Sequence, residues 1–257
     1  MGLLAGPNFT IPEASHLIRS DAAFATEVLR LANSAMLGLR YEVTSVMHAI
    51  SVLGMERLRN LVLTVAMRDF VRGAKPRGLL RLSWRHNLAA ALLAEALAEP
   101  CFIEKSDGYT AGLLHDLGRL ALAAAYPAEY ARVMQCSAGG GQDLFNCETS
   151  ILGISHCDAG LVLAEKWGLP SMIRELLCMR VLSQTGPFTV LRLATVACSM
   201  SDRLGFSLGE CKDSWDPAWL QQQLPPDAWP RMASKVDALA DSIPLKINSF
   251  ECEFLTG

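Results

Sequence analysis

The sequence lacks the features of membrane-spanning and disulfide-bonded proteins. No stretch of its 257 residues approaches 18 consecutive apolar residues, and no charged segment precedes an apolar core at the amino terminus. We therefore expect neither a transmembrane helix nor a signal peptide. The eight cysteines are scattered and include no C-x-x-C pair. This distribution favours reduced thiols in a cytoplasmic protein rather than a disulfide framework.

The chain also lacks an excess of charge and any strand-like pattern. It carries 23 Lys and Arg against 26 Asp and Glu, a net charge of −3, so there is no global basic signal for nucleic acid. Aromatic residues make up only 7% of the chain, and no convincing run alternates apolar with polar residues. The hydrophobic fraction of 51% is nevertheless high enough to build a core, which excludes a disordered protein.

What the sequence does contain is a succession of apolar segments at helical spacing, which predicts an all-α protein. The clearest break in the first half is residues 73–78, which include two Gly and a Pro. We accordingly predict an N-terminal helical lobe over residues 1–76, a multi-helix core over 77–205 and a C-terminal helical extension over 206–257. The core lobe is expected to pack against the smaller N-terminal lobe.

Two details of the N-terminal lobe yield local predictions. Asn33 and Ser34 are poor helix-interior residues, so they indicate either a helix end or a structural polar contact. A helix over residues 46–53 is predicted to end at Gly54, and a longer amphipathic helix follows over residues 56–71.

Residues 110–122 form an apolar run that is interrupted by His115 and Asp116. We predict one helix through this run, to about residue 125, with His115 on its buried face and Asp116 about 100° away. A buried His beside a carboxylate requires a partner, a metal or a proton.

His86 and His156 lie near the starts of two other predicted helices. Helical bundles build metal sites from side chains of facing helices, and imidazole and carboxylate groups suit Fe, Mn or Zn. The remaining histidines, His16 and His48, are isolated in the sequence and are interpreted as ordinary surface or packed residues.

Taken together, these segments resemble the HDOD domains of bacterial signalling proteins, a branch of the HD superfamily of metal-dependent phosphohydrolases. The resemblance covers about residues 11–205 in the family order, and it implies an all-helical, HD-like fold. It is carried by residues 29–35, 49–54, 84–86, 111–118 and 148–153, by His156 and Gly160, and by residues 167–170.

The resemblance also implies a fuller metal shell than this chain provides. In active HD phosphohydrolases a His, a His-Asp pair and a later Asp hold the metal, and His86, His115 and Asp116 match the first three. The later Asp aligns with Cys198, or with Thr195 if the register slips by one turn.

Two further positions bear on the completeness of this shell. Asp202 lies one turn beyond Cys198 and is an uncertain substitute for the missing Asp. Many HDOD domains also carry a His-His pair where this chain has Arg180 and Val181. An Arg at that position would disfavour a cation.

Two interpretations of the site remain open. In one, His86, His115, Asp116 and His156 hold a metal with an incomplete ligand set. In the other, they form a structural polar cluster with no metal. We expect no obligatory cofactor, and at most one divalent ion (Fe, Mn, Zn or Mg).

Two functions follow from these interpretations. The resemblance implies a cytoplasmic regulatory module without catalytic activity, which acts through a signalling protein partner or a nucleotide ligand. The alternative is a metal-dependent phosphohydrolase or phosphodiesterase that acts on a nucleotide. No membrane association is expected. Residues 57–85 are locally basic, but they are interpreted as a solvated helix face and linker, so nucleic-acid binding is not expected.

Overall fold

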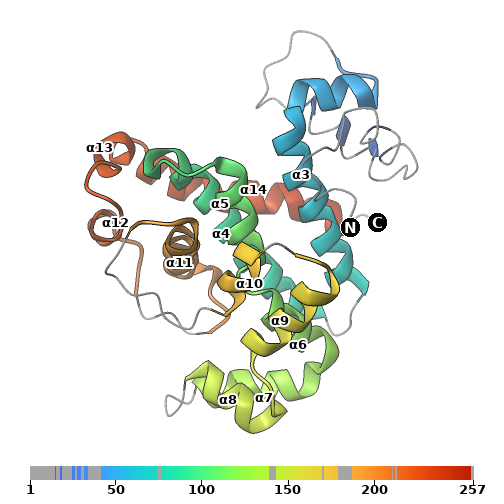
Figure 1. The fold of residues 1–257 in the computed structure, drawn as a ribbon, viewed down its shortest axis with the longest axis vertical. Helices are drawn as coiled ribbons and strands as arrows, with labels where there is room; N and C mark the ends of the chain where they lie inside the picture. Colours follow the sequence, from blue (N-terminus) through green and yellow to red (C-terminus); the bar gives the residue numbers. More distant parts are fainter. Residues whose placement is uncertain are drawn as a thin grey trace. The chain divides into compact units, whose positions relative to one another are not determined.

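In the computed structural model the chain divides into two compact units, Met1–Met67 and Arg68–Gly257. The structure describes residues 42–73, 77–138, 143–169, 171–178, 187–209, 211 and 213–255, together with residues 15, 18, 25, 26, 28, 29, 32 and 33. These parts contain helices and no strand, which confirms the all-α prediction (Figure 1). The predicted domain boundaries, after residues 76 and 205, stay predictions. None of the described helices has the length and apolar character needed to cross a membrane.

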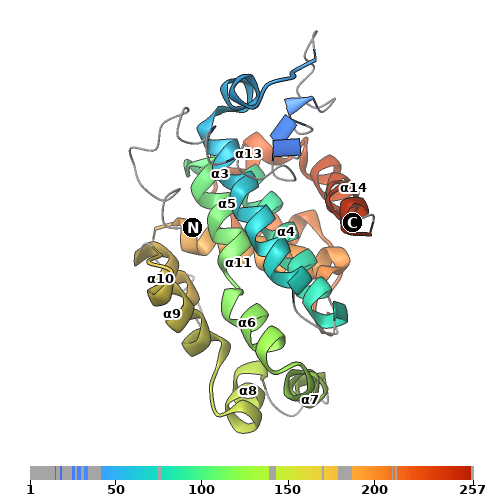
Figure 2. The ribbon, with the colours of Figure 1, turned by 90° about the vertical axis from the view of Figure 1, so that its right-hand side faces the viewer.

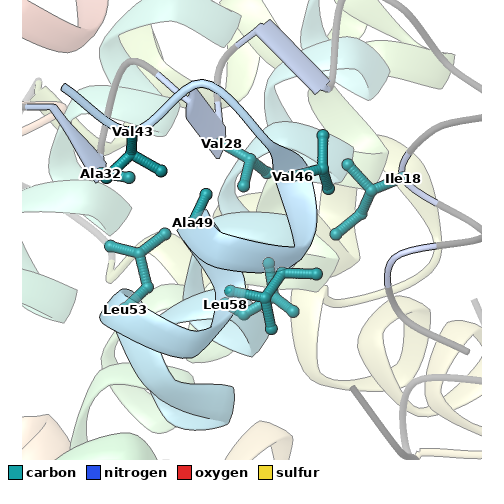
Figure 3. Packing of buried hydrophobic residues seen from close by; sticks show 9 residues of the cluster. Ile18, Val28, Ala32, Val43, Val46, Ala49, Leu53 and Leu58 are labelled. Atoms are coloured by element: carbon teal, nitrogen blue, oxygen red, sulfur yellow. The ribbon is translucent and has the colours of Figure 1, made fainter. Parts of the chain in front are cut away.

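In the first unit, a buried cluster surrounds the start of helix α3 (Val46–Gly73), as Figure 3 shows. Its members are Ile18, Val28, Ala32, Val43, Val46, Ala49, Ile50, Leu53 and Leu58. Within α3, Gly54 has non-helical backbone angles with φ of 77°, in the left-handed region that favours glycine. The predicted interruption at Gly54 is therefore confirmed.

Asn33 supplies a polar contact within the same unit. Its side-chain amide donates to the carbonyl oxygen of Val43 at 2.8 Å, and its side-chain oxygen accepts from the Val43 amide at 2.7 Å. This pair of hydrogen bonds confirms the structural polar contact predicted for Asn33. Ser34 lies outside the described residues.

The second unit contains the helices that position the candidate site. In chain order they are α4 (Arg77–Ala98), η2 (Glu99–Cys101), α5 (Lys105–Leu114), α6 (Leu117–Ala125), α7 (Pro127–Ala138), α8 (Leu144–Leu152), α9 (His156–Lys166), α10 (Ser171–Leu177), α11 (Val190–Ser201), the π-helical turn η3 (Asp202–Phe206), α12 (Pro217–Gln223), α13 (Trp229–Met232) and α14 (Val236–Leu255).

Helix α4 is the central helix of this unit. It contacts α5, α6, α11, α14 and η3, and Figure 2 shows α4, α5 and α11 running beside one another. Its buried residues face several neighbours because the segment after His86 is apolar on nearly every side, which is typical of a helix enclosed by others.

Glycines let α4 and α5 approach more closely than ordinary side chains would allow. A Cβ atom at Gly112 would lie 2.6 Å from the carbonyl oxygen of Ala90, and one at Gly108 would lie 2.9 Å from that of Ala94. The pairs 108–94 and 112–90 run in antiparallel register. The same register brings residue 116 to the level of His86.

The predicted continuous helix through residues 110–125 is wrong, because the chain breaks at His115 and Asp116. Helix α5 ends at Leu114 and α6 begins at Leu117, and Asp116 has φ of −110° and ψ of 25°. The carbonyl oxygen of Gly112, which would accept from the amide of residue 116 in a helix, lies 2.7 Å from Nδ1 of the His115 ring. The side chain thus competes for the carbonyl that would continue the helix.

After this break, Gly118 brings α6 against α9. A Cβ atom at Gly118 would lie 1.8 Å from the carbonyl oxygen of His156 and 2.7 Å from the backbone nitrogen of Gly160. Both obstacles are backbone atoms, which cannot rotate away as a side chain could.

Gly118→Ala should therefore destabilise the protein, by at least about 2 kcal/mol, because the added methyl group forces α6 and α9 apart. Gly78→Ala is the matched control, since Gly78 lies exposed in α4 and an added Cβ would meet no atom within 4 Å. The control should be stabilised by roughly 0.5–1 kcal/mol through helix propensity. Urea unfolding of both variants measures the difference, and equal midpoints would contradict the close packing of α6 on α9.

Candidate metal centre

Three ligand atoms from three different helices converge in the second unit. They are Nε2 of His86 on α4, Nε2 of His115 at the end of α5, and Sγ of Cys198 on α11, and all lie within 4.8 Å of one another. The two nitrogens are 3.1 Å apart, and Sγ is 3.5 Å from Nε2 of His86. We refer to these three residues as the donor cluster.

Backbone acceptors determine the tautomer of both histidines. Nδ1 of His115 lies 2.7 Å from the carbonyl oxygen of Gly112, and Nδ1 of His86 lies 3.2 Å from that of Phe206. A carbonyl oxygen can only accept, so both Nδ1 atoms carry the proton. In the neutral rings, both Nε2 atoms then present lone pairs to each other, and a cation or an additional proton must lie between them.

Residues 201–206 hold the outer side of the His86 ring. Ser201 donates its hydroxyl proton to the carbonyl oxygen of Cys198, and its Oγ lies 3.0 Å from Nδ1 of His86. Oδ1 of Asp202 is 3.4 Å from the same nitrogen. The end of α11 and the π-helical turn that follows it place these groups at the ring nitrogen opposite the donor cluster. Asp202 therefore orients His86, and does not replace the missing carboxylate ligand.

Asp116 is paired with an arginine. Nη1 of Arg119 lies 2.7 Å from Oδ2 of Asp116, whereas Nε2 of His115 and Nε2 of His86 lie 3.7 Å and 3.9 Å from that oxygen. Burial raises the pKa of the Asp116 carboxyl, but the positive charge of Arg119 outweighs it and holds this pKa well below its usual range. The strongest partner of Asp116 is therefore a guanidinium group.

The charges in the donor cluster support one another. Burial raises the pKa of the Cys198 thiol, but the neighbouring His115 and His86 outweigh this effect and lower the pKa to about 6. Burial alone would lower the pKa of His86, but the Cys198 thiolate, Asp202 and Asp116 together raise it to about 10. The pKa of His115 is raised in the same way, against its burial, by Cys198 and Asp116. A thiolate beside a protonated imidazole is thus the favoured charge state without metal.

His156 engages a different partner. Its Nδ1 lies 2.5 Å from Oε2 of Glu148, and its backbone amide donates to the same oxygen at 2.8 Å. Tyr130 donates its hydroxyl proton to the other oxygen of this fully buried carboxylate, at 2.7 Å. The structure therefore brings together His86, His115 and Asp116, and places the His156 ring in a separate pair with Glu148.

The family pattern predicts that Cys198 marks a lost carboxylate ligand, but the structure brings the Cys198 sulfur to the donor cluster. The available signal was the alignment of Cys198 with the family's later Asp, together with the ability of a thiolate to bind metal. Thr195, the alternative in the shifted register, is exposed and donates to the carbonyl oxygen of Leu191.

The sequence also gives no prediction that Arg119 pairs with Asp116, although it lies three residues after it. Arg180 and Val181 lie outside the described residues.

The architecture is that of an HD-like all-α domain in which a His from one helix meets a His-Asp pair at a helix break. A model of the HDOD domain family matches residues 1–180, well over half of the sequence. The chain therefore belongs to the HDOD domain family.

Solved structures with the same fold come from several bacteria. An HDOD domain protein of unknown function from Geobacter sulfurreducens is 23% identical, with a TM-score of 0.72 over 94% of this chain and 88% of that chain. A candidate phosphohydrolase from Shewanella amazonensis SB2B is 21% identical, with a TM-score of 0.70 over 94% and 89%. A candidate signal transduction protein from Marinobacter aquaeolei VT8 is 22% identical, with a TM-score of 0.67 over 96% and 56%.

An uncharacterized protein from Treponema pallidum (strain Nichols) is similar in sequence. It is 26% identical over 172 residues, which cover 66% of this chain. The chain spans about a third of the length of this curated relative.

Two of the three separations within the donor cluster are close to those of a tetrahedral zinc site, and the third, between Nε2 of His115 and Sγ of Cys198, is within 4.8 Å. A tetrahedral zinc ion with usual bond lengths places two nitrogens about 3.3 Å apart and a nitrogen and a sulfur about 3.6 Å apart. The corresponding separations here are 3.1 Å and 3.5 Å. Each histidine also donates its other ring N–H to a backbone carbonyl, the arrangement that supports metal ligation by imidazole.

In the metal-free protein, Cys198 should titrate with a pKa near 6, because the two histidines stabilise its thiolate. The thiolate fraction at this position should fall as the pH drops below 6 and be nearly complete at pH 8. The measurement is the thiolate absorbance near 240 nm after treatment with a chelator, taken as the difference between the wild type and Cys198→Ser. A difference that appears only near pH 9 would contradict the charge state described above.

Proposed function

We propose that this chain is a bacterial regulatory HDOD module that does not catalyse phosphoryl chemistry, and that its donor cluster holds one structural zinc ion. The observation that supports the absence of catalysis is the ion pair between Asp116 and Arg119. An HD hydrolase needs this carboxylate to face a metal and its substrate. Here the guanidinium group of Arg119, whose side chain is 18% exposed, neutralises it.

The burial of the site supports the same conclusion. The side chains of His86, Asp116 and His115 are only 1%, 9% and 10% exposed. A phosphoryl substrate must reach the metal directly, and water must reach the substrate. The three residues of the donor cluster come from α4, the end of α5 and α11, so a bound ion would serve mainly to hold these three helices together.

Cys198 is the reason for proposing zinc. Thiolate ligands select zinc over harder ions such as Mg²⁺ and Mn²⁺, which prefer oxygen. His86, His115 and Cys198 would hold the ion. When bound, the ion would supply the positive charge that the two facing Nε2 lone pairs and the thiolate require.

Protein purified without chelator should therefore contain about one zinc per chain, and Cys198→Ser should lose most of it because the thiolate is removed. Cys178→Ser is the matched control, since Cys178 is exposed and lies outside the donor cluster. Cys198→Asp, which restores the carboxylate that the family resemblance implies, should shift the preference from zinc toward manganese and iron. Elemental analysis measures all three variants, and equal zinc in the wild type and Cys198→Ser would contradict ligation by this thiol.

The alternative function, a metal-dependent phosphohydrolase acting on a nucleotide, is favoured by one observation. His86, His115 and Asp116 remain together, with Oδ2 of Asp116 less than 4 Å from both Nε2 atoms. The chain also has the fold of the candidate phosphohydrolase from Shewanella amazonensis, although at 21% identity this similarity concerns the fold alone.

We expect no hydrolysis of nucleotide phosphodiesters when the protein is supplied with Zn²⁺, Mn²⁺ or Fe²⁺, because Asp116 is held by Arg119. The measurement is product formation, compared with that of His115→Ala under the same conditions. Metal-dependent turnover that disappears in His115→Ala would overturn the regulatory assignment in favour of the hydrolase.

The partner of such a module is proposed to be a signalling protein, with a nucleotide as a second candidate ligand. The candidate signal transduction protein from Marinobacter aquaeolei carries a name that agrees with this proposal, although at 22% identity the similarity concerns the fold alone. The expectations of a cytoplasmic location and of no nucleic-acid binding remain predictions from the sequence.

A further inference from the structure

Two cysteines outside the donor cluster face each other across a helical hairpin. Cys136 lies on α7 and Cys147 on α8, and their Sγ atoms are 2.7 Å apart, with the Cys147 thiol donating to Cys136. None of the seven cysteines with described side chains forms a disulfide. Figures 1 and 2 both show α7 and α8 side by side at the same end of the second unit, in agreement with their contacts.

We propose that Cys136 and Cys147 form an oxidation site of this protein, at which a hydroperoxide converts the two thiols into a reversible intramolecular disulfide. The sulfurs need to close by only about 0.7 Å to reach a normal S–S bond length of about 2.05 Å. The two positions are 11 residues apart in sequence, and α7 already contacts α8. Bond formation therefore requires a local adjustment of two side chains rather than a rearrangement of the fold.

The two thiols differ in a way that assigns their roles. Cys136 is half-buried and so within reach of a small oxidant, whereas Cys147 is fully buried. The S–H···S contact with Cys136 is the main cause that raises the pKa of the Cys147 thiol, to about 11, so this group keeps its proton at neutral pH. Cys136 is thus the thiol that attacks the oxidant, and Cys147 is the resolving thiol.

The chemistry balances in two steps. The Cys136 thiolate attacks one oxygen of the peroxide, the O–O bond breaks, and a sulfenic acid and one molecule of water or alcohol form. The Cys147 sulfur then displaces hydroxide from the sulfenic acid, an S–S bond forms, and the lost proton and hydroxide leave as water. Two electrons pass from the two sulfurs to the peroxide, and an external thiol reverses the change by exchange.

The position of this pair links it to the surroundings of the candidate site. Cys147 directly precedes Glu148, whose carboxylate accepts from Tyr130 on α7 and from His156 at the start of α9. A disulfide would tie α7 to α8 one residue before this carboxylate. The proposal does not depend on metal binding, since neither cysteine belongs to the donor cluster.

The test is stoichiometric oxidation of the reduced full chain by hydrogen peroxide, followed by blocking of free thiols with N-ethylmaleimide and peptide mapping by mass spectrometry without reduction. The expected result is the loss of two thiols per chain, a linked peptide pair containing Cys136 and Cys147, and full recovery of both thiols with dithiothreitol. Cys178 and Cys211 are more exposed, so the extent of their oxidation shows how much solvent exposure alone makes a thiol react.

Variants separate the two roles. Cys147→Ser should accumulate a sulfenic acid at Cys136 that dimedone traps, while Cys136→Ser should form no linked pair. Cys178→Ser and Cys211→Ser should both form the disulfide as the wild type does, since both cysteines are exposed and lie outside the donor cluster. If a variant at position 136 or 147 fails to fold, peptide mapping of the wild-type protein still tests whether the disulfide forms.

Oxidation of Cys178 or Cys211 while Cys136 and Cys147 remain free would overturn the proposal. A linkage between two chains, or one that joins either cysteine to a third position, would overturn it as well.

Discussion

The close approach of α4 and α5 is the constraint on which the candidate site depends. Gly108 and Gly112 pack against the backbone of α4, at distances that no larger residue would permit. Helices at this separation and in this register bring the His86 ring to the level of the break after α5, where His115 and Asp116 lie. Dispersion and burial of apolar surface hold the helices together, and the small residues determine how closely the polar groups meet.

The break between α5 and α6 follows from the same contact. His115 donates from Nδ1 to the carbonyl oxygen of Gly112 and so competes for the acceptor that would continue the helix, and its Nε2 turns toward His86. Two facing lone pairs are unfavourable without a cation or an additional proton, and the Cys198 thiolate stabilises either one. In the proposed zinc site, a thiol in place of the carboxylate that the family resemblance implies would keep a negative charge at this position and would favour a soft ion over a hard one.

The ion pair of Arg119 with Asp116 shows how one nearby residue alters a retained motif. The His-Asp sequence is intact, and an alignment alone would suggest a complete metal-binding pair. Three residues later, on the first turn of α6, Arg119 reaches the carboxylate at 2.7 Å. The motif is present, but its carboxylate is paired with the guanidinium group of Arg119.

The sequence by itself determined the helical class and the interruption at Gly54, because periodicity is a local property of the chain. It left a helix end and a polar contact open for Asn33, and the family resemblance grouped His86, His115 and Asp116 with His156. Only the tertiary structure decided that Cys198 joins the two histidines, that Glu148 takes the His156 ring and that Cys136 faces Cys147. These pairs lie 112, 8 and 11 residues apart, on different helices. Their distances depend on how closely the helices pack, which the spacing of residues along the chain does not specify.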